Sequence, residues 1–205
     1  MNKQRQEDIK QHFEKLYQSG VTPWTDHPLE PALAYYMTYL KEKKPNAKIL
    51  DLGCGDGWIS VQAAKASFET WGIDSSPTAI ESAKKRAQKE RLDTKTHFLV
   101  GDALDLPYED NFFDALVDRG LFHHVLVENR QAYLNNVVRV LKKKSVMYLA
   151  VFSDKNSMGI GQMFTKKSVS DLFGDRFSIV YFQQDPYPTS APAHLIHFIL
   201  KRKQP

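Results

Sequence analysis

Short apolar segments alternate with helix-patterned segments along most of this 205-residue chain. The periodicity predicts strands at 48–52, 69–73, 96–100, 113–117, 146–152, 177–184 and 194–201, with helices at 58–66, 77–91, 129–141 and 168–173 between them. Two further helices, 3–18 and 29–43, precede the first strand. Strands separated by helices pair in parallel and bury both faces, so the pattern predicts an α/β fold. We expect a doubly wound, mostly parallel, seven-stranded sheet with helices on both faces and an antiparallel C-terminal hairpin at one edge.

Length and composition limit the class of protein. A chain of 205 residues is long enough for one sizeable core, so we expect a single domain over 1–205. No apolar run approaches the roughly 20 residues of a membrane span, and the first residues lack the apolar core of a secretory signal. The only cysteine, Cys54, cannot form an internal disulfide. These features predict a cytoplasmic protein without a membrane partner.

The segment ILDLGCGDGW, from Ile49 to Trp58, places three glycines between two acidic residues where the first strand ends. Glycine allows the backbone to bend sharply and to approach a ligand closely. A dinucleotide-binding loop would have its third glycine one position later than Gly57. Carboxylates at Asp51 and Asp56 are also poor neighbours for a phosphate. The loop therefore favours a ligand with an ammonium group and a positive centre.

Two further aspartates follow the next two strands. Asp74 lies 21 residues after Gly53, the distance at which an acidic residue accepts hydrogen bonds from ribose hydroxyls. Asp102 follows the third strand, where it could accept from the exocyclic amine of an adenine. Ligands of open parallel sheets bind at the carboxyl ends of the strands. The placement of acidic residues at three successive strand ends predicts a nucleoside site there.

At these residues the sequence resembles the class I S-adenosylmethionine-dependent methyltransferases. Four segments carry the resemblance: 49–57, Gly72-Ile73-Asp74-Ser75, Gly101-Asp102-Ala103 and the strand "FFDALVD" within 111–118. It covers about residues 47–152 and implies a Rossmann-like fold, with S-adenosyl-L-methionine as cofactor and S-adenosyl-L-homocysteine as product. The turn before the fifth strand departs from the family's usual one, which we interpret as a changed turn remote from the cofactor. The implied cofactor-binding set is Asp51, Gly53, Cys54, Gly55, Asp56, Gly57, Asp74, Ser75, Ser76, Asp102, Ala103, Asp118, Arg119 and Trp24.

Two weaker resemblances point to enzymes that act on small molecules. The segment "DRGLFHHV" at 118–125 is similar to a signature of small-molecule methyltransferases. The segment "GVTPWTDHP" at 20–28 partly resembles the lid of thiopurine and tellurite-resistance methyltransferases, although Thr25 separates the tryptophan from the aspartate. The resemblance implies that 1–45 forms an N-terminal helical lid or cap, in which Trp24 could cover the sulfonium. Packing against the N-terminal helix is the alternative for Trp24, and Tyr17 and His27 are further candidates for the same wall.

His123 and His124 are the candidate catalytic residues, because an imidazole can take a proton from a thiol or a hydroxyl near neutral pH. Capping or packing of the following helix is the alternative for one of them. We expect segment 153–164 to form a mobile lid and 185–193 a rigid arch over the site. His194 and His197 are expected at the edge or surface, and no metal site is predicted.

The sequence thus predicts methyl transfer to a small-molecule acceptor, whether thiol, amine, hydroxyl or metalloid. One alternative is a nucleic-acid methyltransferase, which the sequence pI near 9.0 favours. Adenine and cytosine methyltransferase motifs are missing after the fourth strand, so no nucleic-acid partner is expected. The sequence is also compatible with a binding protein that lacks turnover and, more remotely, with a nicotinamide-dependent oxidoreductase. Neither the acceptor nor the oligomeric state can be read from the sequence.

Overall fold

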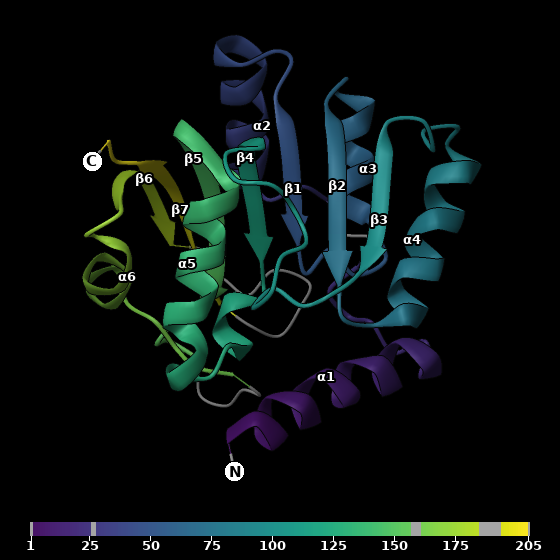
Figure 1. Ribbon diagram of the computed structural model, residues 1–205, viewed down its shortest axis with the longest axis horizontal. Coiled ribbons are helices and arrows are strands. Elements are labelled where there is room, and N and C mark those ends of the chain that lie inside the picture. Colours follow the sequence, from purple (N-terminus) through teal and green to yellow (C-terminus); the bar gives the residue numbers. More distant parts are fainter. Residues whose placement is uncertain (1, 26–27, 157–160, 185–193, 205) are drawn as a thin grey trace.

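A computed structural model describes residues 2–25, 28–156, 161–184 and 194–204 (Figure 1). The strands are β1 (Lys48–Leu52), β2 (Glu69–Asp74), β3 (Thr96–Val100), β4 (Phe113–Arg119), β5 (Leu141–Phe152), β6 (Phe177–Gln184) and β7 (Leu195–Arg202). The α-helices are α1 (Asn2–Ser19), α2 (Pro31–Lys43), α3 (Trp58–Lys65), α4 (Pro77–Lys89), α5 (Arg130–Val140) and α6 (Lys166–Phe173). Two 3₁₀ turns, Phe122–His124 and Val127–Asn129, lie between β4 and α5. The predicted elements are present, and most boundaries agree within two residues.

The strands form one seven-stranded sheet in the order β3-β2-β1-β4-β5-β7-β6. The first five strands pair in parallel, and β7 is antiparallel to both β5 and β6. The predicted α/β fold with an antiparallel C-terminal pair is therefore confirmed.

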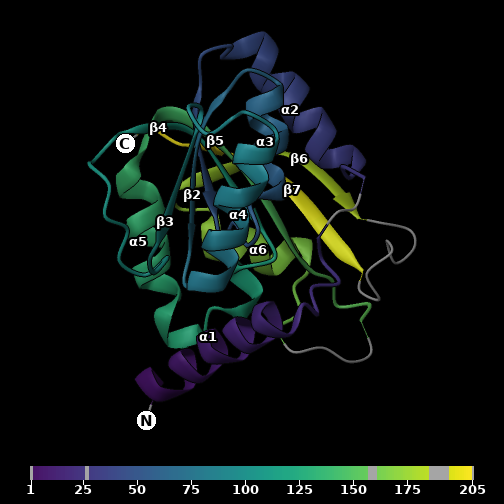
Figure 2. The same cartoon turned by 90° about the vertical axis from the view of Figure 1, so that its right-hand side faces the viewer.

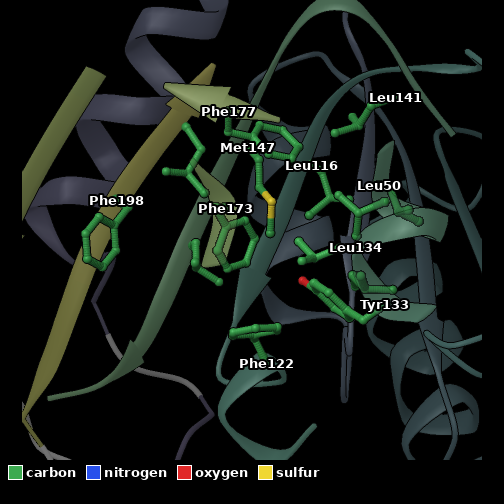
Figure 3. Packing of buried hydrophobic residues seen from close by; sticks show 14 of the residues in the cluster. Leu50, Leu116, Phe122, Tyr133, Leu134, Leu141, Met147, Phe173, Phe177 and Phe198 are labelled. Atoms are coloured by element: carbon green, nitrogen blue, oxygen red, sulfur yellow. The ribbon is translucent and has the colours of Figure 1, made fainter. Parts of the chain in front are cut away.

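Helices cover both faces of the sheet, as the view from its edge shows (Figure 2). On one face, α5 and α6 pack over Leu50, Leu116 and Met147 in an apolar cluster that also contains Phe173 (Figure 3). On the other face, α2 and α3 pack over the alternate residues of the same strands, among them Ile49. Both faces of β1 are buried because successive side chains of a strand point to opposite sides.

Strand β7 lies inside the sheet, and this corrects one expectation. His197 is fully buried, and its Nδ1 is 2.7 Å from the Tyr148 hydroxyl. The sequence pattern predicts an edge or surface position for this residue. The chain inserts its last strand between β5 and β6, so β6 forms the edge and a residue of the terminal strand becomes part of the core.

Helix α1 lies apart from both layers and crosses the carboxyl ends of the strands (Figure 1). It runs from the connection after β4 toward the start of α4, to which it makes contacts. Helix α2, by contrast, buries Leu33, Tyr36 and Leu40 against the sheet. Of the two N-terminal helices, α1 therefore covers the edge of the sheet where ligands bind.

Candidate active site

A cavity lies between α1 and the carboxyl ends of the parallel strands. Thirteen of the residues predicted for the site line it: Trp24, Asp51, Gly53, Cys54, Gly55, Asp56, Asp74, Ser75, Asp102, Ala103, Arg119, His123 and His124. Three of the predicted residues do not line it: Gly57, Ser76 and Asp118. The strand ends thus bring together residues that are far apart in the sequence.

Gly57, Ser76 and Asp118 do not line the cavity, but they stabilise the helix starts and the turn that surround it. Gly57 precedes the first residue of α3 in a left-handed conformation, with φ at 75°. Ser76 caps α4, because its Oγ accepts from the Ala79 amide. Asp118 is buried and accepts from the Tyr133 hydroxyl at 2.5 Å and from the amides of the turn that carries His123. Burial raises the pKa of Asp118 to about 6.

The glycine loop is packed closely on two sides. A Cβ on Gly53 would come within 2.9 Å of the Leu121 side chain, and a Cβ on Gly55 would lie 2.3 Å from the Tyr17 hydroxyl. Both glycines adopt positive φ, which other residues rarely tolerate. The loop therefore requires glycine for its conformation and for the space that it leaves.

Asp74 is held at the rim of this loop by backbone hydrogen bonds. One carboxylate oxygen accepts from the Gly55 amide and the other from the Ser76 amide, each at 2.9 Å. Burial nevertheless raises the pKa of Asp74. A carboxylate oxygen accepts more than one hydrogen bond, so Asp74 can still bind hydroxyl groups in the cavity.

The two aspartates of segment 49–57, Asp51 and Asp56, have different partners. Asp51 accepts from the Ser60 hydroxyl at 2.6 Å, and its burial raises its pKa to about 7. Asp56 forms an ion pair with Arg86, with 2.5 Å between Oδ2 and Nη2. The negative charge of the loop is thus partly neutralised by protonation and pairing.

Helix α1 contributes a polar row that the sequence analysis missed. Gln6 bonds to the connection after β4, at the Leu126 amide and the His124 carbonyl. Lys10 pairs with Asp102 at 2.7 Å. Glu14 accepts from the Ser76 and Thr78 hydroxyls at the start of α4, at 2.5 and 2.6 Å. Their i, i+4, i+8 spacing places them on one helix face, a signal that was present in the sequence.

Aromatic rings form another part of the wall. Trp24 donates its indole N–H to the Tyr17 hydroxyl at 3.0 Å and meets the Phe13 ring edge-on at 5.6 Å. Phe13 in turn meets His124 at 4.8 Å. Trp24 therefore both lines the cavity and packs against α1, so its two predicted roles are compatible.

His123 is fixed in position and in tautomer. Its ring stacks on Phe152 with 3.6 Å between centroids, and its Nδ1 accepts from the Phe152 amide at 3.3 Å. Burial lowers its pKa well below the ordinary value, so the ring is neutral. A neutral imidazole that accepts at Nδ1 carries its proton on Nε2. His123 is therefore arranged as a hydrogen-bond donor.

His124 lies beside it with fewer constraints. The two imidazole centroids are 4.3 Å apart. Burial lowers the pKa of His124 to about 4, which keeps this ring neutral at physiological pH. Among the described residues, neither of its ring nitrogens has a hydrogen-bond partner. One N–H and one lone pair of His124 are thus available to a ligand.

Arg119 lines the cavity but is already paired. Its Nε lies 2.6 Å from Oε1 of the buried Glu30, and its Nη2 contacts the same oxygen. Its Nη1 donates to the Trp24 carbonyl at 3.3 Å. Arg119 therefore connects the wall formed by Trp24 to the start of α2.

The two predicted covers are only partly described. The segment 185–193, residues 157–160 of the other segment and the candidate His27 lie outside the described residues. From the described part of the other segment, the backbone N–H of Gln162 donates to the His123 carbonyl at 2.8 Å. Within the described ranges, no group of three acidic, histidine or cysteine side chains is arranged to hold a metal ion. In that same part of the chain, none of the helices is long and apolar enough to cross a membrane.

Comparison with known proteins indicates the family of this chain. A model of the methyltransferase-domain family matches residues 43–184. Norajmaline N-methyltransferase from Rauvolfia serpentina is 30% identical over 129 residues, which cover 62% of this chain and 44% of that protein. The 2-heptyl-1-hydroxyquinolin-4(1H)-one methyltransferase of Mycobacteroides abscessus is 28% identical over 71% of this chain and 66% of its own length. The match thus spans less than two thirds of either relative.

A solved structure shows the same fold. The 1,6-didemethyltoxoflavin-N1-methyltransferase of Burkholderia thailandensis, solved with 1,6-didemethyltoxoflavin and S-adenosylhomocysteine bound, superposes with a TM-score of 0.78. It is 22% identical, and the match covers 96% of this chain and 88% of that one.

The family match extends over more than half of the chain and includes each of the strand ends that line the cavity. The chain therefore belongs to the methyltransferase-domain family, and its class is that of the class I S-adenosylmethionine-dependent methyltransferases. The family and cofactor predicted from the sequence are confirmed at this level.

Proposed function

We propose that this chain transfers a methyl group from S-adenosyl-L-methionine to a small organic molecule bound in the same cavity. One observation carries the proposal: Asp51, Asp74 and Asp102, from the ends of three adjacent strands, line a single cavity together with the glycine loop. Carboxylates in this arrangement suit the hydroxyl, amine and ammonium groups of a nucleoside that bears an amino acid.

The residues present fit this cofactor. Gly55 lines the cavity without a side chain, and a Cβ there would clash with the Tyr17 hydroxyl, so Tyr17 packs directly over the loop. We assign Asp74 to the ribose, Asp102 and the Ala103 amide to the adenine, and the loop from Gly53 to Gly55 to the amino-acid end. Lys10 would then exchange its contact with Asp102 for another partner when the adenine amine binds there.

When bound, the cofactor supplies a methyl carbon activated by a positive sulfur. The acceptor's lone pair forms the new bond to this carbon, and the electrons of the broken carbon–sulfur bond remain on sulfur. Any proton that the acceptor loses passes to solvent. The protein has to position the acceptor and to exclude water, which lowers the barrier by proximity and desolvation. In our proposal Trp24 and Phe13 exclude water, and the two histidines position the acceptor.

The relatives support a small acceptor. Their names describe methyl transfer to norajmaline and to a heptyl-substituted hydroxyquinolinone, both of which are compact organic molecules. We therefore assign this chain a small-molecule partner and no nucleic-acid partner. Cys54 is a free buried thiol, which fits a protein that works in the reducing cytoplasm.

We further propose that 1–205 is one domain in which α1 and the loop that contains Trp24 are the covering part of the N-terminal segment 1–45. The contacts of Gln6, Lys10 and Glu14 support this assignment, because each attaches α1 to a different side of the cavity.

Titration calorimetry tests the proposal. S-adenosylhomocysteine and S-adenosylmethionine should bind, whereas NAD should give no heat. Asp74→Ala should weaken binding of S-adenosylhomocysteine by about 1–3 kcal/mol, because charge-assisted hydrogen bonds are lost. Asp110→Ala is the matched control, since this carboxylate is exposed and does not line the cavity.

Turnover requires a second measurement. Labelled methyl should pass from the cofactor to at least one member of a panel of amines, phenols and thiols. Absence of heat with both forms of the cofactor would refute the proposal. Cofactor binding without any labelled product across the panel would favour a binding protein that lacks turnover.

A further inference from the structure

The two sides of the cavity differ in chemistry because of the strand order. Since β1 lies between β2 and β4, Asp74, which ends β2, and Asp102, which follows β3, lie on one side of it. On the other side, His123, His124 and Phe152 follow or end β4 and β5, and Phe13 and Trp24 extend over them from α1 and its loop. These five residues form a continuous chain of ring contacts with centroids 3.6–5.6 Å apart, which we call the aromatic end.

The aromatic end offers no free charge among the described residues. Lys10 and Arg119 are the cations that line the cavity, and they pair with Asp102 and Glu30. Both histidines are neutral because they are buried. An anionic acceptor would lose its hydration here without gaining an opposite charge from any of these side chains, which is strongly unfavourable.

The two imidazoles nevertheless leave polar atoms for a ligand. His123 is held with its Nε2–H as donor, because its Nδ1 already accepts from the Phe152 amide. That N–H has no partner among the described residues, and neither ring nitrogen of His124 has one. A polar group that is cut off from water without a partner is costly, so whatever fills the cavity has to satisfy these atoms.

We infer that the methyl acceptor is a neutral, flat, apolar molecule that carries a hydrogen-bond acceptor next to the N–H or O–H that receives the methyl group. His123 donates to the first group and His124 accepts from the second. The short distance between the two rings suits neighbouring atoms of one ligand, and the surrounding rings pack well against a flat ring. The inference rests on the proposed function, because acceptor and cofactor share the cavity.

Three probes separate the elements of this inference. In 2-quinolinone, a carbonyl lies beside an N–H on a flat apolar skeleton. In 1-methyl-2-quinolinone the carbonyl remains and the N–H is lost. Quinoline-2-carboxylate has a similar shape and a full negative charge. Binding of each to protein saturated with S-adenosylhomocysteine is measured by calorimetry, so the measurement does not depend on turnover.

We expect 2-quinolinone to bind about three- to tenfold more tightly than its N-methyl form, the effect of one neutral hydrogen bond, and the carboxylate to give no heat. His124→Phe should abolish the difference between the two lactams. His123→Phe should weaken both lactams by a similar factor and keep the difference between them. His97→Phe is the control, because His97 is exposed on β3 outside the cavity, and it should change nothing.

The possible failures can be told apart. If S-adenosylhomocysteine itself does not bind, the proposed function and this inference both fall. The inference alone is overturned if the loaded protein does not bind 2-quinolinone, if it binds the carboxylate as tightly as the lactam, or if His124→Phe retains the preference for the N–H. Should His123→Phe fail to fold, the wild-type protein and His124→Phe still decide the question.

Discussion

Replacing Gly57 by alanine should destabilise the protein through two separable effects. Gly57 has φ at 75°, and the left-handed region costs a residue with a Cβ about 1–2 kcal/mol. The new Cβ would also lie 2.8 Å from the Ala83 Cβ and 2.8 Å from the Phe98 ring, a contact that nearly all real Cβ atoms avoid. Overpacking of this kind costs about 1–3 kcal/mol.

A matched control isolates the steric effect. Gly20 has a similar φ of 72°, but a Cβ there would meet nothing within 4 Å. Alanine also lowers the entropy of the unfolded chain, which returns about 0.4–1 kcal/mol at either position. We therefore expect Gly57→Ala to cost about 2–4 kcal/mol and Gly20→Ala about 0.5–1 kcal/mol.

Urea denaturation followed by circular dichroism measures both values, provided that the m-values match. The difference of about 1–3 kcal/mol then reports the contact of the glycine loop with α4 and β3. Equal losses at the two positions would refute the argument, because they would mean that conformation alone requires glycine at Gly57.

Three other perturbations test the elements that support the cavity. Tyr133→Phe should lower stability by about 1–3 kcal/mol in urea melts, since it removes the donor from buried Asp118; a loss below about 0.5 kcal/mol would contradict that role. Lys10→Met should cost less than about 1 kcal/mol, because the pair with Asp102 is partly exposed, yet hydrogen exchange of α1 amides should accelerate; unchanged exchange would mean that this pair does not hold the helix. His124→Phe should flatten the dependence of stability on pH. The folded pKa of about 4 lies below the unfolded value of 6.5, so the wild type loses stability as the pH falls from 6.5 toward 4, by up to about 1.4 kcal/mol per pH unit. Unfolding curves that shift in parallel for wild type and variant would argue against a buried neutral His124.

Much of the fold could be read from the sequence because the signals are local. Strand 48–52 and helix 77–89 follow from periodicity and from the cap at Ser76. Strand β5 begins at Leu141, five residues before the apolar run that predicted it, because Leu141 pairs with Phe113 of β4 and the register then shifts across the lysines at 142–144. Pairing with a neighbouring strand decided that boundary, and periodicity carries no information about such pairing.

What the sequence determined by itself is the approach of the carboxylates at 51, 74 and 102. Parallel strands that alternate with helices must end at the same edge of the sheet, so residues that follow them converge. Only the tertiary structure decided which side chains face them from α1, where His197 lies and which nitrogen of His123 carries the proton. These features depend on contacts between segments far apart in the chain, such as the Phe152 amide with His123 and Lys10 with Asp102. No local pattern encodes such a contact, because the energy that selects it arises only when both segments have packed.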